Sequence, residues 1–254
     1  MRLDQYLVKA GHFSSRHQAQ VEIKHGRIKV DGVVIKKPSK DINESQEITV
    51  LEAYNPYVSQ GGLKLIFALE TFKLDVQNMN VMDVGSSTGG FTDVLLKNGA
   101  ASVKAIDVGR AQMVEPLRSD PRVHLHEETH FLDAPESWFT AIDLIVMDVS
   151  FTSSLPLIFH AYRTFSKQTI VLIKPQFETV KTPASGVIKD KKLHIEVLRK
   201  YQDALNDQAL YIKAIKASPD KGKQTNLEFL CLLDLTPSTI DVKAVVEAAH
   251  MARK

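Results

Sequence analysis

Residues 82–95, with the sequence MDVGSSTGGFTDVL, decide the fold class of this 254-residue chain. An apolar strand pattern ends at Val84, a glycine-rich turn follows, and an apolar helical pattern begins at Phe91. A strand, a glycine turn and a helix in this order are typical of doubly wound α/β folds, which bind nucleotides at such turns. The stretch therefore predicts both an α/β sheet and a ligand site.

The chain after this turn continues to alternate between short runs rich in Val, Ile and Leu and helical patterns. Strands are expected at 80–84, 102–108, 122–126, 141–149, 169–173, 209–218 and 226–235, and helices at 61–73, 91–99, 111–119, 153–165, 192–207 and 238–254. Such alternation predicts a mostly parallel sheet that is covered on both faces. The polar tract PDKGKQT between the last two strands is too short for a crossover, so the last strand is expected to be antiparallel.

The spacing of the glycines in the turn restricts the ligand. They follow the pattern G-x-x-x-G-G, which is neither the G-x-G-x-x-G of dinucleotide sites nor a phosphate loop. Glycines let the backbone approach a ligand closely. Asp83 precedes the turn and could accept a hydrogen bond from an ammonium group, and Asp107 ends the next strand, where an acid commonly holds ribose hydroxyls. We favour S-adenosylmethionine over a dinucleotide or an empty turn.

The apolar strand at 169–173 is followed by Lys174 and Pro175. A structural lysine is expected to extend from an exposed edge, not to end a central apolar strand. Pro175 favours an extended backbone at Lys174, which restricts where its side chain points. Asp83 and Asp148 end two other strands, so all three polar residues are expected at one edge of the sheet. Asp148 by itself could equally be a helix cap.

The positive charge is concentrated in residues 1–40, which have nine Lys and Arg against three acidic residues, whereas the remainder has a net charge of −4. Two helical patterns, the second with Ser15 and Gln18 as a capping box, precede a hairpin signal at Asp31 and Gly32. We expect a small α+β RNA-binding domain at 1–55 and a catalytic domain at 56–254, although a solvated basic face remains the alternative. The candidate RNA contacts are Arg2, Arg16, Lys24, Arg27, Lys29, Lys36 and Lys37.

Other features narrow the class of protein. No run approaches the ~18 consecutive apolar residues of a membrane helix, and no secretory signal is evident. Cys231 is the single cysteine, so it cannot form an internal disulfide, which is consistent with a reducing cytoplasm. We expect a cytoplasmic protein without metal or membrane partners, and the oligomeric state stays open.

The ordered motifs SQGGLKL, DVGSSTGGFTDVLL, AIDVG, MDVSF, IKPQFE, GVIKD and NLEFL resemble those of the TlyA-type proteins. Members of this family are described as haemolysins or as rRNA 2'-O-methyltransferases. The resemblance implies a Rossmann-like class I methyltransferase sheet of the FtsJ type. It also implies an N-terminal alpha-L RNA-binding motif, similar to that of ribosomal proteins and pseudouridine synthases. The partner implied is ribosomal RNA or a ribosomal subunit, with cytidines as targets.

The family also implies a set of site residues. A tetrad maps onto Lys64, Asp148, Lys174 and Glu228. Cofactor contacts map onto Asp83, Gly85, Ser86, Ser87, Gly89, Asp107 and Glu127. Because burial and a second ammonium group disfavour a charged lysine, Lys64 is expected to help Lys174 accept the proton of the 2'-hydroxyl. Asp148 would hold Lys174 in line, and Glu228 would orient Lys64 or the ribose.

Four positions depart from the family pattern, namely Gln60, Ser86, Arg110 and His130. They flank the tetrad or the cofactor turn and leave the tetrad intact. Three alternatives stay open: an RNA-binding protein with an inactive methyltransferase-like domain, a membrane-active haemolysin, and a nicotinamide dehydrogenase. The intact tetrad disfavours the inactive RNA-binding protein. The absence of a membrane-span pattern disfavours the haemolysin, and the glycine spacing disfavours the dehydrogenase.

Overall fold

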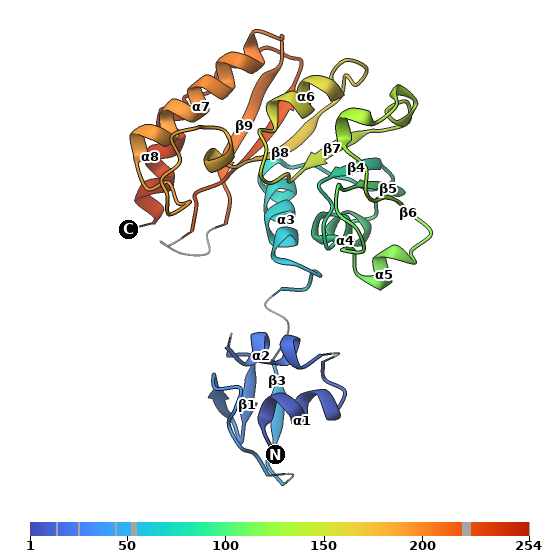
Figure 1. The fold of residues 1–254 in the computed structure, drawn as a ribbon, viewed down its shortest axis with the longest axis vertical. Helices are drawn as coiled ribbons and strands as arrows, with labels where there is room; N and C mark the ends of the chain where they lie inside the picture. The colour runs from blue at the N-terminus through green and yellow to red at the C-terminus, as the bar shows by residue number, and fades with distance from the viewer. Residues whose placement is uncertain (14, 25, 44, 52–54, 220–224, 254) are drawn as a thin grey trace. The chain divides into compact units, whose positions relative to one another are not determined.

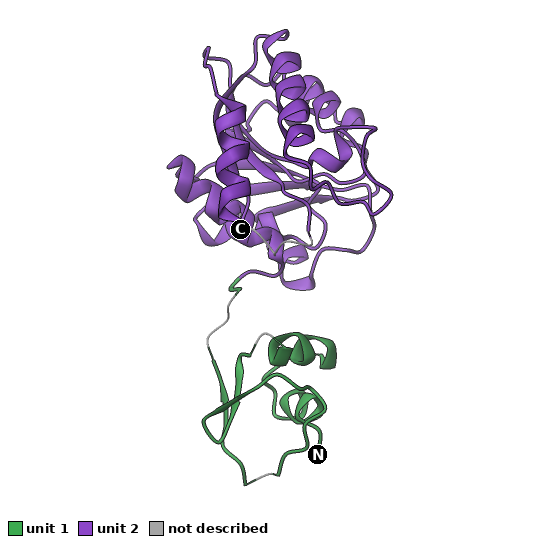
Figure 2. Ribbon diagram, turned by 90° about the vertical axis from the view of Figure 1, so that its left-hand side faces the viewer, with its two compact units in different colours: residues 1–56 green, residues 57–254 purple. Residues whose placement is uncertain are grey.

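The computed structural model describes residues 1–254 except 14, 25, 44, 52–54, 220–224 and 254. The polar tract expected between the last two strands falls largely on 220–224 and lies outside this range. The chain forms two compact units, Met1–Pro56 and Tyr57–Lys254 (Figure 2). Each is described separately.

The N-terminal unit packs two short helices on a small antiparallel sheet. Its elements are α1 (Leu3–Lys9), α2 (Arg16–Lys24), β1 (Ile28–Val30), β2 (Val33–Ile35) and β3 (Ile48–Val50), with the strand order β2-β1-β3. Leu3, Leu7, Ile23 and Ile28 are fully buried in its core. Leu3 and Leu7 lie at helical spacing on α1, as the sequence predicted, Ile23 comes from α2, and Ile28 comes from β1.

The hairpin and the helix cap of this unit follow from local residue chemistry. Val30 pairs with Val33 across a two-residue loop. Asp31 and Gly32 both have positive φ, at 50° and 77°, as a type I′ turn requires. The Ser15 hydroxyl accepts a hydrogen bond from the backbone N–H of Gln18 at 3.2 Å, so the cap predicted for α2 is present.

The C-terminal unit is built on a seven-stranded sheet with the order β6-β5-β4-β7-β8-β10-β9 (Figure 1). The strands are β4 (Asn80–Val84), β5 (Ser102–Ile106), β6 (Val123–His126), β7 (Leu144–Met147), β8 (Thr169–Ile173), β9 (Tyr211–Ala217) and β10 (Phe229–Asp234). The pairs from β6 to β8 are parallel, and β10 is antiparallel to both β8 and β9. The predicted Rossmann-like class, with its antiparallel last strand, is confirmed.

Helices cover both faces of this sheet. They are α3 (Gln60–Phe72), α4 (Gly90–Lys97), α5 (Glu115–Arg118), α6 (Leu155–Ala161), α7 (Lys191–Asn206) and α8 (Val242–Ala252), with short 3-10 turns η1 (Phe131–Asp133), η2 (Glu136–Trp138) and η3 (Pro175–Phe177). One core cluster joins α3, α4 and α5 to the sheet, and another joins α6, α7 and α8. The sheet is therefore the middle of three layers, so its strand ends remain available for a site.

The helix expected at 111–119 is much shorter in the structure. Pro116 has no N–H to donate and is tolerated only in a first turn, so α5 begins at Glu115. Before it, Ala111 has a φ of 51°, and the N–H of Gln112 bonds Glu127 at 3.3 Å. Residues 111–114 are thus a loop beside the glycine turn. The helix expected at 153–165 likewise ends early, at Ala161, and continues as hydrogen-bonded turns.

Candidate active site

Three strands of the sheet end in polar residues that lie near one another. Asp83 is the penultimate residue of β4, Asp148 follows β7, and Lys174 follows β8. These strands are consecutive in the order β4-β7-β8 and run parallel. Their carboxyl ends therefore meet at a single edge of the sheet, where doubly wound folds bind their ligands.

The glycine turn is too crowded for larger residues. A Cβ on Gly85, whose φ is +83°, would lie 2.7 Å from the backbone oxygen of Asp148. A Cβ on Gly90 would lie 2.0 Å from the Ser59 hydroxyl, where the first turns of α3 and α4 meet. Glycine at these positions lets β4, β7 and the two helices approach closely. Close approach of the chain itself thus accounts for part of the glycine pattern.

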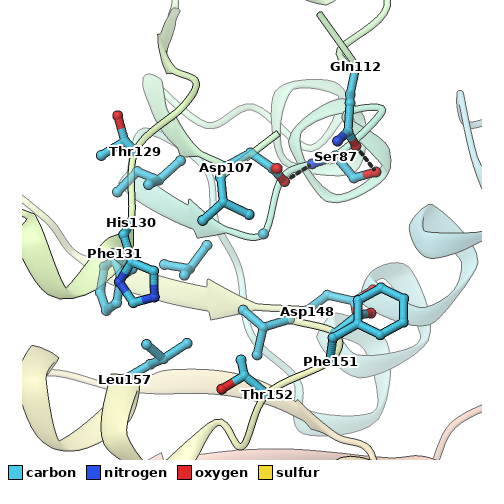
Figure 3. Close-up of a pocket in the computed structure, with 16 residues that line it drawn as sticks. Ser87, Asp107, Gln112, Thr129, His130, Phe131, Asp148, Phe151, Thr152 and Leu157 are labelled. Atoms are coloured by element: carbon cyan, nitrogen blue, oxygen red, sulfur yellow. Dashed lines mark hydrogen bonds between the residues drawn. The ribbon is translucent and has the colours of Figure 1, made fainter. Parts of the chain in front are cut away.

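A cavity of about 290 Å³ lies beside this turn (Figure 3). Ser87 and Asp107 lie at one side of it, and Asp148 and Phe151 at another. The carboxylate of Asp107 accepts hydrogen bonds from the backbone N–H groups of Ser87 at 2.7 Å and Gly109 at 2.6 Å. These bonds hold an acidic group at the cavity wall, where it can accept from ribose hydroxyls.

The seven predicted cofactor contacts do not all line this cavity. Gly85, Ser87 and Asp107 do so. Glu127 is absent from its wall, and its carboxylate instead accepts a hydrogen bond from Arg118 at 2.6 Å beside the 111–114 loop. Ser86 lines an adjoining cavity instead.

Two further predicted contacts lie behind the walls. Gly89 is the N-cap residue that directly precedes α4, with a φ of +94°. Asp83 is fully buried behind the turn, where its carboxylate accepts a hydrogen bond from the Thr92 hydroxyl at 2.6 Å. Burial raises the pKa of Asp83 to about 7, and the nearby carboxylates of Asp148 and Asp107 add to this effect.

The adjoining cavity, of about 180 Å³, contains the lysine pair. Lys64, from the first turns of α3, and Lys174 both line it, together with Asp148 and Ser150. Lys174 is buried, and its Nζ lies 2.5 Å from Asp148 Oδ1 and donates to the Ser150 hydroxyl at 2.8 Å. The lysine that ends the apolar strand therefore has two oxygen partners inside the protein.

The second lysine has its own carboxylate. Lys64 Nζ donates to Glu228 Oε2 at 2.6 Å, and Glu228 directly precedes β10. Lys64, Asp148 and Lys174 therefore line a single cavity, and Glu228 bonds Lys64. The four tetrad positions form two ion pairs, Lys64–Glu228 and Lys174–Asp148. An influence of Lys64 on the protonation of Lys174 stays a prediction.

Glu178, the last residue of the KPQFE motif, has a structural role that sequence reasoning missed. Its carboxylate accepts hydrogen bonds from the Ser153 hydroxyl and from both the N–H and the hydroxyl of Ser154. Ser154 also bonds the Tyr201 hydroxyl at 2.8 Å inside the core. Glu178 thereby ties the segment after β8 to the start of α6 and to α7. The available signal was the glutamate that ends the IKPQFE motif.

The basic residues of the N-terminal unit fall into two groups. Asp4 is fully buried and accepts hydrogen bonds from Arg2, Arg16 and Gln20, which hold the pKa of its carboxyl well below the usual range, the Arg2 bond most of all. Arg27 donates to Glu22 and to the backbone oxygen of residue 51. The side chains of these arginines therefore have partners within the unit itself.

The lysines of this unit are more accessible. Lys24, Lys36 and Lys37 are exposed, and Lys29 is half-buried in β1. Lysine side chains with their ammonium groups in water can exchange counterions for phosphate. Exposure therefore favours Lys24, Lys36 and Lys37 over Arg2 and Arg27 as candidate phosphate contacts, whereas Arg16 is itself exposed although it bonds Asp4.

Three departures from the family pattern can be placed. His130 lines the larger cavity, and its Nδ1 accepts a hydrogen bond from the N–H of Leu132, so it caps η1. Arg110 is exposed and lies 3.9 Å from Glu128. The Ser86 hydroxyl is buried at the wall of the lysine cavity and has no hydrogen-bond partner among the described residues.

The two cavities share Gly85, Ser87, Asp148 and Ser150 in their walls. A long ligand could therefore extend from the Asp107 side to the lysine pair. The unpartnered Ser86 hydroxyl and the close backbone of the glycine turn fit the amino-acid end of S-adenosylmethionine, and Asp107 fits its ribose. The sheet order, the glycine turn and these cavities define a class I methyltransferase.

Comparison with known families agrees with this class. Residues 57–235 match the FtsJ-like methyltransferase family, and residues 1–48 match the S4 domain. The chain belongs to the FtsJ-like methyltransferase family, whose cofactor is S-adenosylmethionine. No helix in the described part of the chain is both long and apolar enough to cross a membrane.

Full-length relatives confirm the resemblance to TlyA-type proteins. The chain is 35% identical over 258 residues to the 16S/23S rRNA (cytidine-2'-O)-methyltransferase TlyA of Mycobacterium tuberculosis, covering 99% of this chain and 96% of that protein. It is 37% identical over 237 residues to Hemolysin A of Brachyspira hyodysenteriae, covering 91% and 98%. The solved structure of a candidate hemolysin from Streptococcus thermophilus is similar with a TM-score of 0.75 at 35% identity, covering 99% and 96%.

Proposed function

We propose that this protein transfers a methyl group from S-adenosylmethionine to a ribose 2'-hydroxyl of ribosomal RNA, with cytidine as the target nucleotide. The observation that carries the proposal is the Lys174–Asp148 ion pair. It lies where the cavity of about 290 Å³, which would hold the cofactor and is called the cofactor cavity, adjoins the lysine cavity. Cytidine rests on the named activity of the relative from Mycobacterium tuberculosis.

When bound, S-adenosylmethionine would supply an electrophilic methyl group to the ribose 2'-oxygen and would leave as the neutral thioether S-adenosylhomocysteine. Lys174 acts as the base: in its neutral form, Nζ accepts the proton that the 2'-hydroxyl loses. Asp148 holds this amine in place through the 2.5 Å contact and, as a carboxylate, balances positive charge in the site. Such positioned proton transfer contributes about 10²- to 10⁴-fold to a rate.

Lys64 and Glu228 form the second part of the proposed machinery. Their 2.6 Å ion pair lies between the lysine cavity and a polar cavity of about 340 Å³ that Glu228 also lines. We assign Lys64 to hold the ribose oxygen or its flanking phosphate. An ammonium group can donate three hydrogen bonds, and the bond to Glu228 uses one of them. Glu228 would keep the ammonium group in place.

The surface of the site offers an aromatic side chain for the target nucleotide. Phe151 lines the cofactor cavity, is 91% exposed, and lies 5.4 Å from the ring of Phe177. A base can stack on an exposed aromatic ring without reading its hydrogen-bonding edge. The lysines of the N-terminal unit would contact phosphates, and a ribosomal substrate is consistent with a cytoplasmic protein.

The proposal is tested by methyl transfer to purified ribosomal subunits, with mapping of the modified nucleotide. Lys174→Ala should lower methyl transfer by at least about 10²-fold because the base is lost, while calorimetry should show S-adenosylmethionine binding retained. Lys167→Ala is the matched control, since Lys167 precedes the same strand at its far end and forms an exposed ion pair with Asp143.

Two outcomes would contradict the proposal. Parallel loss of binding and transfer in Lys174→Ala would argue against a purely catalytic lysine. RNA binding without any transfer by the wild-type protein would favour the alternative, an RNA-binding protein with an inactive domain.

A further inference from the structure

Ser150 lies at the point where the two cavities of the site adjoin. It lines both of them, as do Gly85, Ser87 and Asp148. Among these four residues, Asp148 and Ser150 contact Lys174. The hydroxyl of Ser150 is therefore beside the amine at the place where, in the proposed function, cofactor and ribose must meet.

The two oxygen partners determine how the Lys174 amine is oriented. A neutral amine has two N–H bonds and one lone pair, arranged tetrahedrally with the bond to Cε. Ser150 Oγ accepts an N–H at 2.8 Å, whereas Asp148 Oδ1 lies 2.5 Å away as the ion-pair partner and receives no hydrogen bond among the described residues. The bond to Ser150 is therefore the directional contact that sets the rotation of the amine. Without it, attraction to Asp148 would hold the nitrogen in place and leave the direction of the lone pair unset.

We propose that Ser150 is a positioning residue that aims the lone pair of Lys174 at the ribose 2'-hydroxyl. The inference rests on the proposed function of Lys174 as the base. A hydroxyl suits this role better than a second carboxylate, because it accepts an N–H without adding negative charge beside the proton acceptor. The Ser150 hydroxyl proton is free to bond a neighbouring acceptor during the reaction.

The backbone after Ser150 supports a specific placement of this residue. Phe151 has a φ of 66°, an uncommon conformation for a residue with a bulky side chain. Sparsely populated backbone conformations are unfavourable and persist where the surroundings impose them, often at functional sites. The positive φ of Phe151 lets its ring be exposed while the preceding Ser150 hydroxyl bonds the buried Lys174.

Three serine substitutions test the inference in the full-length protein. Ser150→Ala should lower kcat by about 10- to 100-fold, because misplacement of a reacting group by ~1 Å can cost about 10²-fold. Binding of S-adenosylmethionine and of ribosomal subunits should be unchanged. Ser150→Thr retains the hydroxyl and should restore most of the activity. Ser137→Ala is the matched control, since Ser137 is exposed in η2 and lines neither cavity.

Three results would overturn the inference: wild-type kcat in Ser150→Ala, loss of cofactor binding that accounts for the fall in kcat, or failure of Ser150→Thr to restore activity. A second measurement does not depend on catalysis. NMR of isotope-labelled lysine amines should show the Lys174 ammonium protons exchanging with water faster in Ser150→Ala than in the wild-type protein. If the wild-type protein transfers no methyl group, the proposed function fails, and this exchange comparison still shows whether Ser150 orders the amine.

Discussion

The buried carboxyl group of Asp83 should make the stability of the ligand-free protein depend on pH. Its side chain is fully buried, and burial raises its pKa from 3.8 to about 7. The hydrogen bond from Thr92 opposes this shift, and the carboxylates of Asp148 and Asp107 reinforce it. The pKa in the folded protein therefore lies above that in the unfolded chain.

The sign and the size of the effect follow from this difference. Because the folded protein holds the proton more tightly, folding is favoured most below pH 3.8, and the advantage is lost as the pH rises towards 7. A difference of roughly 3 units at 1.36 kcal/mol each corresponds to about 4 kcal/mol of folding free energy lost above that range.

Asp83→Asn tests the calculation, since an amide oxygen can still accept the Thr92 hydroxyl and the side chain has no charge. The free energy of unfolding should be measured by urea denaturation at several pH values between about 4 and 8. Any cost of the new amide N–H groups does not vary with pH, so the change in slope is the quantity to compare. Asp133→Asn, which removes an exposed carboxylate of η1, is the control.

Relative to the wild-type protein, Asp83→Asn should gain stability steadily from pH 4 to pH 8, by up to about 4 kcal/mol, while Asp133→Asn should not. Parallel curves for Asp83→Asn and the wild-type protein would refute the argument that burial governs this carboxyl group.

Two further predictions concern the glycine turn and the C-terminal helices. Gly85→Ala should weaken cofactor binding and lower the free energy of unfolding by more than the ~1–2 kcal/mol of left-handed strain, because its Cβ would meet the backbone of Asp148. Gly186→Ala is the control, since Gly186 has a φ of +71° and open space around it. Equal losses of stability in the two variants would contradict the prediction. His194 lies 3.1 Å from His250, and burial together with the charges of His250 and Arg253 lowers its pKa to about 4, against an opposing effect of Asp190. Because the folded state prefers neutral His194, stability should be lost as the pH falls from 6.5 to about 4, and His194→Gln should reduce that loss in urea titrations; an unchanged slope would count against it.

Local residue chemistry accounts for the parts of the fold that the sequence predicted well. The hairpin follows from Asp31 and Gly32, which accept positive φ, and the sheet follows from runs of apolar residues between helical patterns. The prediction of a helix at 111–119 was wrong in its start, and the cause is again local residue chemistry. Pro116 permits only a start at Glu115, and the preceding segment bonds Glu127 instead.

The sequence by itself determined the class of sheet, the position of the glycine turn and the set of polar residues at the strand ends, because periodicity and turn chemistry act within a few residues. The tertiary structure decided which of these residues are partners. Lys64 and Glu228 are 164 positions apart, and Lys174 and Ser150 are 24 apart, yet each pair is within hydrogen-bond distance. Such contacts need two side chains placed to within a few tenths of an ångström, and only the packing of strands and helices sets positions that closely.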